Sequence, residues 1–325
     1  MPQPPSSRRA PSRAARALLL CACACASGAP PSPLDPLRAR LVAAALPAPG
    51  DELAAPAAAA IAAQAPWLLS TQRADGSWPD VDYADSTDNS AWNASTALQR
   101  SLMLGVAARG AASAADAAGF CNASVLATRF WLATAPRNEN WWWSQLGEVS
   151  SVARALLLCP DSAAAAAASA PGGLFSRTTE ADVAAWPGAN RVWGAVAFIL
   201  AAAVADNSSA VDAGFDLLRG GYAVSALGED GPQADSSFHQ HGPLAQFSYA
   251  YGAHYIANAL TMEAVALGTQ WASTPAQWGV VASTLLDGSR WVTRGPEFAL
   301  STMGRHNTYF LRADAFGVVS GHCAC

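Results

Sequence analysis

Long stretches of strong helix formers dominate this chain and limit the folds that are open to it. Segments rich in Ala, Leu and Val are separated by Gly, Pro, Asn and Asp, and examples span 90–109, 123–133, 149–158, 192–205, 252–267 and 278–292. Alanine and leucine favour the helix, and no run of residues shows the alternation expected of strands. We therefore predict an all-α fold.

The arrangement of these segments predicts how the helices pack. Helices joined by long loops at regular intervals indicate helical hairpins packed in a ring or array, although no strict sequence repeat is present. The segment 192–205 is apolar around nearly its whole circumference, so we expect it to be buried on several sides. We interpret the alanine run at 163–168 as a loop or helix extension.

The N-terminal residues have the order of a targeting segment. An apolar run at 17–26 ends in small residues and is preceded by four arginines, Arg8, Arg9, Arg13 and Arg16. This order predicts a secretory signal over residues 1–28. A transit peptide is the alternative, because the segment is rich in Arg and Ser and lacks acidic residues. The apolar run is too short to cross a bilayer, so we expect a secreted protein without a membrane span.

Three glycosylation sequons support secretion, at Asn93, Asn122 and Asn207. Cys121 and Cys159 can pair in an oxidising compartment, although two cysteines alone do not prove a disulfide. Residues 29–50 are rich in Pro and Ala, and we interpret them as a linker that leads into one domain over 51–325.

Charge and composition exclude several classes of partner. Charged residues make up 13% of the chain and the net charge is −5, so the clustered Lys and Arg that nucleic-acid binding requires are absent. The C-terminal Cys323 and Cys325 lack the further ligands that a metal site needs. We expect a monomer with no metal and no cofactor.

A tryptophan motif stands directly before the segment 149–158. Residues 140–148 read Asn-Trp-Trp-Trp-Ser-Gln-Leu-Gly-Glu. Trp141, Trp142 and Trp143 cannot all point into one core from a helix or strand, so at least one should be exposed. An exposed aromatic patch usually binds a ligand, and a flat indole ring suits stacking on sugars. The alternative is a packed loop.

Two further motifs also precede helical segments. Residues 186–192 read Trp-Pro-Gly-Ala-Asn-Arg-Val, which places Asn190 close to an N-cap, where it either caps the helix or directs its amide into a cleft. Residues 235–242 read Asp-Ser-Ser-Phe-His-Gln-His-Gly, and Tyr249 and Tyr251 follow. The chain has only five histidines and six tyrosines, so this cluster of both types indicates proton-transfer chemistry.

These motifs, in this order, resemble those of polysaccharide lyase family 8, which includes hyaluronate, chondroitin AC and xanthan lyases. The family's Asn-Trp-Trp, Gly-Ala-Asn-Arg and Asp-Gly-Ser-Phe-x-Gln-His-Gly correspond to residues 140–142, 188–191 and 235–242, with Ser236 in place of Gly. A Gly-Arg motif after Asp-Gly-x-Arg-Trp corresponds to Gly304 and Arg305. The resemblance covers about residues 65–312 and implies an incomplete (α/α) toroid of helical hairpins, the family's N-terminal helical domain.

The resemblance implies a carbon–oxygen lyase that cleaves a uronic-acid-containing acidic polysaccharide by β-elimination. Asn190 matches the family residue that neutralises the uronate carboxylate, and His241 matches the active-site histidine. The family's catalytic tyrosine precedes a glycine, which implies Tyr251. The spacing from His241 to Tyr251 is one residue longer than in the family, so Tyr249 is the alternative base. Arg305 would hold Tyr251 or a substrate oxygen.

The same resemblance implies residues that bind the sugar chain. Trp141 and Trp142 correspond to the aromatic patch that orients the substrate, and Asn140 belongs to the same motif. Arg290 is a candidate for binding an acidic polymer, as are Arg294 and Arg312. The alternative for these three arginines is a solvated surface charge.

The chain also departs from the family. Members carry β-sandwich domains after the helical domain, and position 309 is Tyr where the family has a second Arg. We therefore expect a fragment or an incomplete gene model, and a protein made of the helical domain alone is the alternative. For the function, the alternative is a carbohydrate-binding fragment without activity. An unrelated helical hydrolase, with Asp235 and Glu148 as paired carboxylates, is a third hypothesis.

Overall fold

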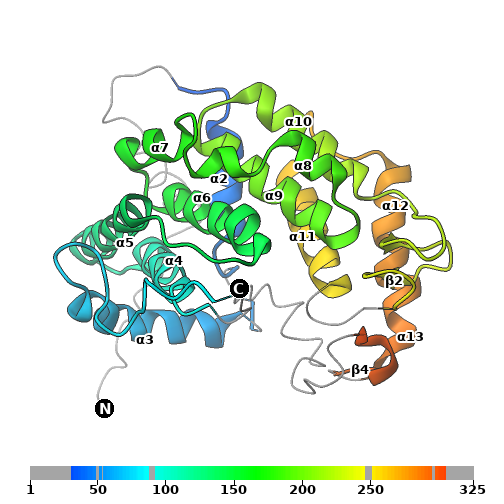
Figure 1. The fold of residues 1–325 in the computed structure, drawn as a ribbon, viewed down its shortest axis with the longest axis horizontal. Helices are drawn as coiled ribbons and strands as arrows, with labels where there is room; N and C mark the ends of the chain where they lie inside the picture. Colours follow the sequence, from blue (N-terminus) through cyan, green and yellow to red (C-terminus); the bar gives the residue numbers. More distant parts are fainter. Residues whose placement is uncertain are drawn as a thin grey trace, which may run out of the picture.

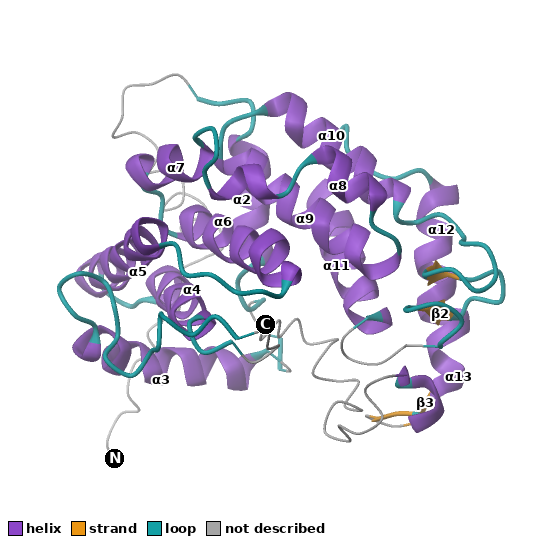
Figure 2. Ribbon diagram, in the orientation of Figure 1, coloured by secondary structure: helices purple, strands orange, loops and turns teal. Residues whose placement is uncertain are grey.

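The computed structural model describes residues 31–48, 51–52, 54–87, 92–245, 251–294 and 297–304. Within these ranges the regular structure is almost entirely helical (Figure 2). The strands form two antiparallel pairs of two residues each, β1 (Gly231–Pro232) with β2 (Phe238–His239) and β3 (Thr293–Arg294) with β4 (Glu297–Phe298). The prediction of an all-α fold is confirmed.

Four helices form the central row of the fold. They are α4 (Ser95–Gly110), α6 (Glu148–Leu158), α9 (Gly188–Val204) and α11 (Gly252–Ala266), and each contacts the next. The other α-helices of the described part are α2 (Asp35–Ala44), α3 (Ala55–Thr71), α5 (Ala114–Thr134), α7 (Ser162–Ser169), α8 (Glu180–Ala185), α10 (Ser208–Gly220), α12 (Pro275–Ser283) and α13 (Arg290–Val292). Of these, α2, α3, α5, α8 and α10 pack against the central row, and α7 packs on α5. Figure 1 shows the helices following an open arc from α3 to α12 and α13, which is the predicted incomplete toroid of hairpins.

Several helices begin where a side chain caps the first turn. Asp161 accepts a hydrogen bond from the Ala164 N–H at the start of α7. Thr179 with Asp182 before α8, and Thr274 with Gln277 before α12, form reciprocal capping boxes. Such caps satisfy N–H groups that the helix itself leaves unpaired. The alanine run at 163–168 is therefore a separate helix, α7, which the Asp161 cap starts.

Helix α9 lies between the two hydrophobic cores of the domain. Ile199 and Leu200 belong to a core that α9 forms with α10 and α11, whereas Ala197 and Ala201 belong to a core that it shares with α4, α5 and α6. A helix that is apolar on all sides must be buried on all sides. The expectation that this segment is enclosed is confirmed.

Two predicted boundaries differ from the structure. The segment interpreted as a linker contains α2, because Leu37, Leu41 and Val42 bury an apolar face against α6, α9 and α11. Helix α9 begins at Gly188 rather than at 192, so Asn190 is the third residue of the helix and does not cap it. The loop residue Pro187 takes the capping position without a side-chain hydrogen bond.

Cys121 and Cys159 form a disulfide that joins α5 to the C-terminal end of α6. Their Cα atoms are 5.4 Å apart, within the usual range for a disulfide. The bond closes a loop of 38 residues and fixes the outer helix α5 to the central row.

Glu148 is a buried carboxyl at the first position of α6. Its side chain is 1% exposed, and Oε2 accepts hydrogen bonds from the Trp131 indole and the Arg177 guanidinium, each at 3.2 Å. Burial raises the pKa of Glu148 to about 7, against a partial opposing effect of Arg177. These contacts anchor the end of the tryptophan motif to the core.

The raised pKa of Glu148 makes the stability of the domain depend on pH. The unfolded chain releases this proton near pH 4.5 and the folded domain near pH 7, so the folded state binds more protons in that window and stability falls as the pH rises. Between pH 4.5 and 7.5, we expect the free energy of unfolding of Glu148→Gln to rise by up to about 3 kcal/mol relative to that of the native protein. Urea unfolding at both pH values measures this gain, and a difference that is independent of pH would contradict it.

Candidate active site

His241 and Tyr251 are brought together from two sides of a loop. His241 follows β2, and Tyr251 is the residue immediately before α11. The His241 Nε2 and the Tyr251 hydroxyl are 2.8 Å apart, and the two rings are nearly perpendicular. Either atom can be the donor, depending on the histidine tautomer. This is a short contact through which a proton can pass between an imidazole and a phenol.

The backbone at His241 adopts a left-handed conformation, with φ of +62°. This conformation is uncommon for residues with a Cβ and is often found at functional sites when it occurs. The side chain is exposed. His241 is therefore presented to solvent while its ring contacts Tyr251.

Asn190 lies on the first turn of α9, at the same end of the helix as the His241 loop. The Ala189 N–H donates to the Gln240 side-chain oxygen at 3.0 Å, so the residues next to Asn190 and His241 are in direct contact. Asn190 is half-buried, and its side chain makes no hydrogen bond to any other residue that the structure describes. Its amide is thus available to a ligand, at the positive end of the helix dipole.

The three tryptophans of the motif have three different environments. Trp141 is 43% exposed, Trp142 is half-buried and Trp143 is 5% exposed within the core shared by α4, α5 and α6. Asn140 starts this turn, because its side-chain oxygen accepts a hydrogen bond from the Trp142 N–H. The prediction that at least one of the three is exposed is confirmed.

Trp193 connects the tryptophan motif to the His–Tyr pair, and sequence reasoning missed it. Its ring centroid is 6.2 Å from that of Trp142 and 5.9 Å from that of Tyr251. It stands three residues after Asn190 on α9, so the two side chains share one face of the helix. That spacing was readable in the sequence, but the expected start of the helix at 192 hid it.

A second tryptophan outside the motif extends the aromatic surface. The Trp186 ring lies 5.3 Å from that of Trp141, and Trp186 comes from the loop before α9. We call Trp141, Trp142, Trp186 and Trp193 the aromatic platform. It runs from the turn before α6 to the residue that packs on Tyr251.

The other predicted residues lie elsewhere or outside the described part. Arg290 is exposed on α13, with its guanidinium 5.0 Å above the ring of Trp291. No contact joins it to the platform or the His–Tyr pair among the described residues. Tyr249, Arg305 and Arg312 fall in ranges that the structure does not describe.

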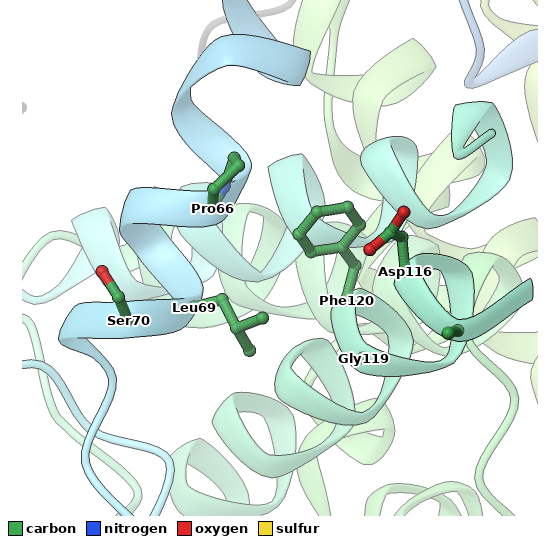
Figure 3. Close-up of a pocket in the computed structure, with 7 residues that line it drawn as sticks. Pro66, Leu69, Ser70, Asp116, Gly119 and Phe120 are labelled. Carbon is green, nitrogen blue, oxygen red and sulfur yellow. The ribbon is translucent and has the colours of Figure 1, made fainter. Parts of the chain in front are cut away.

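Two cavities among the described residues lie away from this site. Figure 3 shows a groove of about 300 Å³ between α3 and α5, lined by Pro66, Leu69, Asp116 and Phe120 among others. A smaller cavity of about 210 Å³ lies between α12 and the β1–β2 hairpin. Neither of these two cavities includes a predicted site residue.

The paired-carboxylate hypothesis does not fit the structure. Glu148 is buried in the core, whereas Asp235 is exposed in the loop between β1 and β2. The Ser237 hydroxyl and N–H hold the pKa of Asp235 below its usual value. A carboxyl enclosed by protein cannot protonate a polymer, so these residues do not form a hydrolase pair.

A family model matches most of the sequence. The sequence model of polysaccharide lyase family 8, N-terminal alpha-helical domain, matches residues 48–289. No curated protein matches the sequence. Within the described part of the chain, no helix is long and apolar enough to cross a membrane.

Solved lyase structures share the fold at low sequence identity. A chondroitinase AC lyase has a TM-score of 0.68 at 20% identity over 84% of this chain. A Paenibacillus xanthan lyase has a TM-score of 0.70 at 19% identity over 88%, and a Streptomyces coelicolor chondroitin AC lyase has 0.72 at 19% over 89%. The matched parts are 39%, 28% and 41% of those proteins, so this chain spans less than half of their length.

The family match covers most of the chain, and the shared fold is that of the helical part of these lyases. The resemblance found in the four sequence motifs is therefore confirmed, and the chain belongs to polysaccharide lyase family 8.

Proposed function

We propose that this domain cleaves an acidic, uronic-acid-containing polysaccharide by β-elimination. The observation that carries the proposal is the 2.8 Å contact between His241 and Tyr251 beside the first turn of α9, which carries Asn190. An aromatic platform leads into the same place. These groups supply a base, a donor for a carboxylate and a surface for sugar rings.

The proposed reaction moves one proton from carbon to oxygen. A deprotonated Tyr251, hydrogen-bonded by His241, removes the proton at C5 of the uronate. The electrons of the C5–H bond form a C4–C5 double bond, and the C4–O bond breaks with its electron pair on the leaving oxygen. Tyr251 then returns the proton to that oxygen, which is a general acid–base cycle without water.

Asn190 would make the C5 proton acidic enough to remove. A charged carboxylate next to C5 opposes further negative charge, and a donor that neutralises it lets the developing charge spread onto its oxygens. A side-chain amide donates without adding a titrating group. Arg305, whose Gly-Arg motif resembles that of the family, would steady the phenolate or a substrate oxygen.

The direct test is turnover of defined polymers by the purified chain. Hyaluronan, chondroitin and bacterial or algal uronans are incubated with the protein, and the ultraviolet absorbance of the conjugated double bond is followed. We expect a rise with at least one polymer and a matching unsaturated product by mass spectrometry. Folded protein that gives no rise with any of them would contradict the proposal.

The second candidate is a carbohydrate-binding domain without activity. It is favoured by the aromatic platform, because indole rings can bind sugars whether or not the His–Tyr pair is active. Under this hypothesis the aromatic platform binds the polymer and the native protein does not cleave it. Tyr251→Phe then has the same dissociation constant as the native protein. Isothermal titration with the same polymers separates binding from cleavage.

Trp141 gives a test of the platform. We expect Trp141→Ala to weaken polymer binding about tenfold, since one stacking indole contributes about 1–2 kcal/mol. The kcat should change little, because the ring is not in contact with the His–Tyr pair among the described residues. Titration and steady-state kinetics measure both quantities.

The matched control for this test is Trp67→Ala. Trp67 is 52% exposed on α3 and packs on Arg100, away from the platform. Equal loss of binding in the two variants would mean that the platform is not the binding surface.

We further propose that the protein is secreted and glycosylated, with residues 1–28 as its signal and 51–325 as the lyase domain. Asn93, Asn122 and Asn207 are all exposed, as acceptor sites must be. The Cys121–Cys159 disulfide fits an oxidising compartment. Expression in a eukaryotic secretion host, followed by glycosidase treatment and a gel shift, tests this proposal.

A further inference from the structure

One carboxylate holds the chain on both sides of His241. Asp230 Oδ2 accepts a hydrogen bond from the Gln240 side-chain amide at 2.5 Å, and Oδ1 accepts one from the Gly242 N–H at 2.8 Å. The residues before and after His241 are therefore fixed to the same group. This bracket stabilises the left-handed backbone of His241, which a residue with a Cβ does not favour by itself.

The same amide reaches the start of α9. Gln240 is fully buried, and its oxygen accepts a hydrogen bond from the Ala189 N–H at 3.0 Å. A Cβ added at Gly188 would lie 2.5 Å from that oxygen and 3.1 Å from the Asp230 Cβ. The close approach explains why glycine is required at 188, where φ is +57°. A continuous chain of hydrogen bonds thus runs from Gly242 through Asp230 and Gln240 to Ala189.

We infer that Asp230 and Gln240 are positioning residues that set the distance between the Asn190 amide and the His241–Tyr251 pair. The inference rests on the proposed function, in which these groups act on adjacent atoms of one uronate. Asn190 belongs to a helix and His241 to a loop, so only a contact between the two elements can fix their separation. An error of about 1 Å in such a constellation can cost about 10²-fold in rate.

The arrangement predicts which kinetic constant changes. Asp230 and Gln240 are not part of the aromatic platform, so binding of the polymer should be nearly unaffected when they are altered. The kcat should fall, because the proton transfer and the neutralisation of the carboxylate no longer coincide. A rise in KM without a fall in kcat would instead mean that these residues act in substrate binding.

Gln240→Glu removes the hydrogen bond from residue 240 to Asp230 with almost no change in the shape of the side chain. It places a second carboxylate against Asp230, and like charges at this distance repel. We expect kcat to fall about 10²-fold, with KM within about threefold of the native value. Far-ultraviolet circular dichroism and a thermal melt confirm that the variant is folded at the assay temperature.

The double variant Asp230→Asn with Gln240→Glu is the matched rescue. The amide and the carboxylate exchange places, so Asn at 230 accepts from Gly242 and donates to Glu at 240, which accepts from Ala189. Every hydrogen bond between Gly242 and Ala189 is restored, and the negative charge moves from residue 230 to residue 240. We expect kcat to recover to within about threefold of the native value, and a double variant as slow as Gln240→Glu would overturn the inference.

A readout that does not need turnover separates this inference from the proposed function. Proton–nitrogen NMR of the His241 ring should shift in Gln240→Glu and return in the double variant. If the native protein cleaves no polymer, the proposed function fails while this comparison still tests the positioning of His241. If the native protein is active and neither kcat nor the ring signal responds to Gln240→Glu, the positioning role is wrong.

Discussion

Replacing Tyr251 with phenylalanine should abolish turnover, with a loss in kcat of about 10³-fold or more. The variant keeps the ring that packs on Trp193 but removes the hydroxyl that contacts His241 at 2.8 Å. That oxygen is the proposed group that takes the C5 proton and returns it to the leaving oxygen, and general acid–base catalysis contributes about 10²–10⁴-fold for each positioned group. Steady-state kinetics on the polymer that the native protein cleaves measures the effect.

Tyr255→Phe is the matched control for this variant. Tyr255 lies one turn further along α11, and its hydroxyl is buried with no hydrogen-bond partner among the residues described. Removing that hydroxyl deletes an unpaired polar atom, so activity should be retained and stability unchanged or slightly improved. A loss of activity in both variants would show a general effect of altering α11.

The comparison with Tyr249→Phe decides which tyrosine is the base. Tyr249 lies outside the described residues, and only the sequence spacing makes it the alternative. Full activity in Tyr251→Phe with a large loss in Tyr249→Phe would transfer the role to Tyr249. Loss in Tyr251→Phe alone would support the contact seen with His241.

The second large effect is expected at Asn190. Asn190→Ala removes a single donor to the uronate carboxylate, and a donor of this kind contributes about 10²–10³-fold to kcat. The stability of the domain should not fall, since the Asn190 side chain has no hydrogen bond to another described residue and alanine favours the helix. We therefore expect low kcat with an unchanged melting temperature.

Asn190→Asp sharpens this prediction because it keeps the shape and inverts the electrostatics. A carboxylate on the protein would face the carboxylate of the substrate, so the loss should be at least as large as for alanine at neutral pH. The matched control is Asn122→Ala, at an exposed site on α5. Activity retained in Asn190→Asp would contradict a role in neutralising the substrate.

Much of the architecture follows from local sequence. The predicted segments 90–109, 149–158 and 252–267 correspond to α4, α6 and α11, whose ends lie within five residues of the predicted bounds, because helix propensity and apolar period act over short distances. Helix α2 was missed because its Pro and Ala content is typical of a linker. Only its contacts with α6, α9 and α11 show that Leu37 and Leu41 belong to the core.

The candidate site was less predictable than the fold. The motifs named Asn190, His241 and Tyr251, since each stands in a recognisable run of residues. Trp193 and Asp230 stand in no such run, and their importance depends on partners far away in the sequence, Trp142 and Gln240. Local patterns carry no information on contacts of this kind.

The sequence by itself determined that this chain is helical, which family it resembles and which residue types carry its chemistry, because those properties reside in short segments. Tertiary structure alone decided that Tyr251 reaches His241, that Gln240 connects the histidine loop to α9 and that Trp193 joins the platform to the phenol. The physical reason is that hydrogen bonds and ring packing depend on separations of a few ångströms, and these are set only when the hairpins pack against one another.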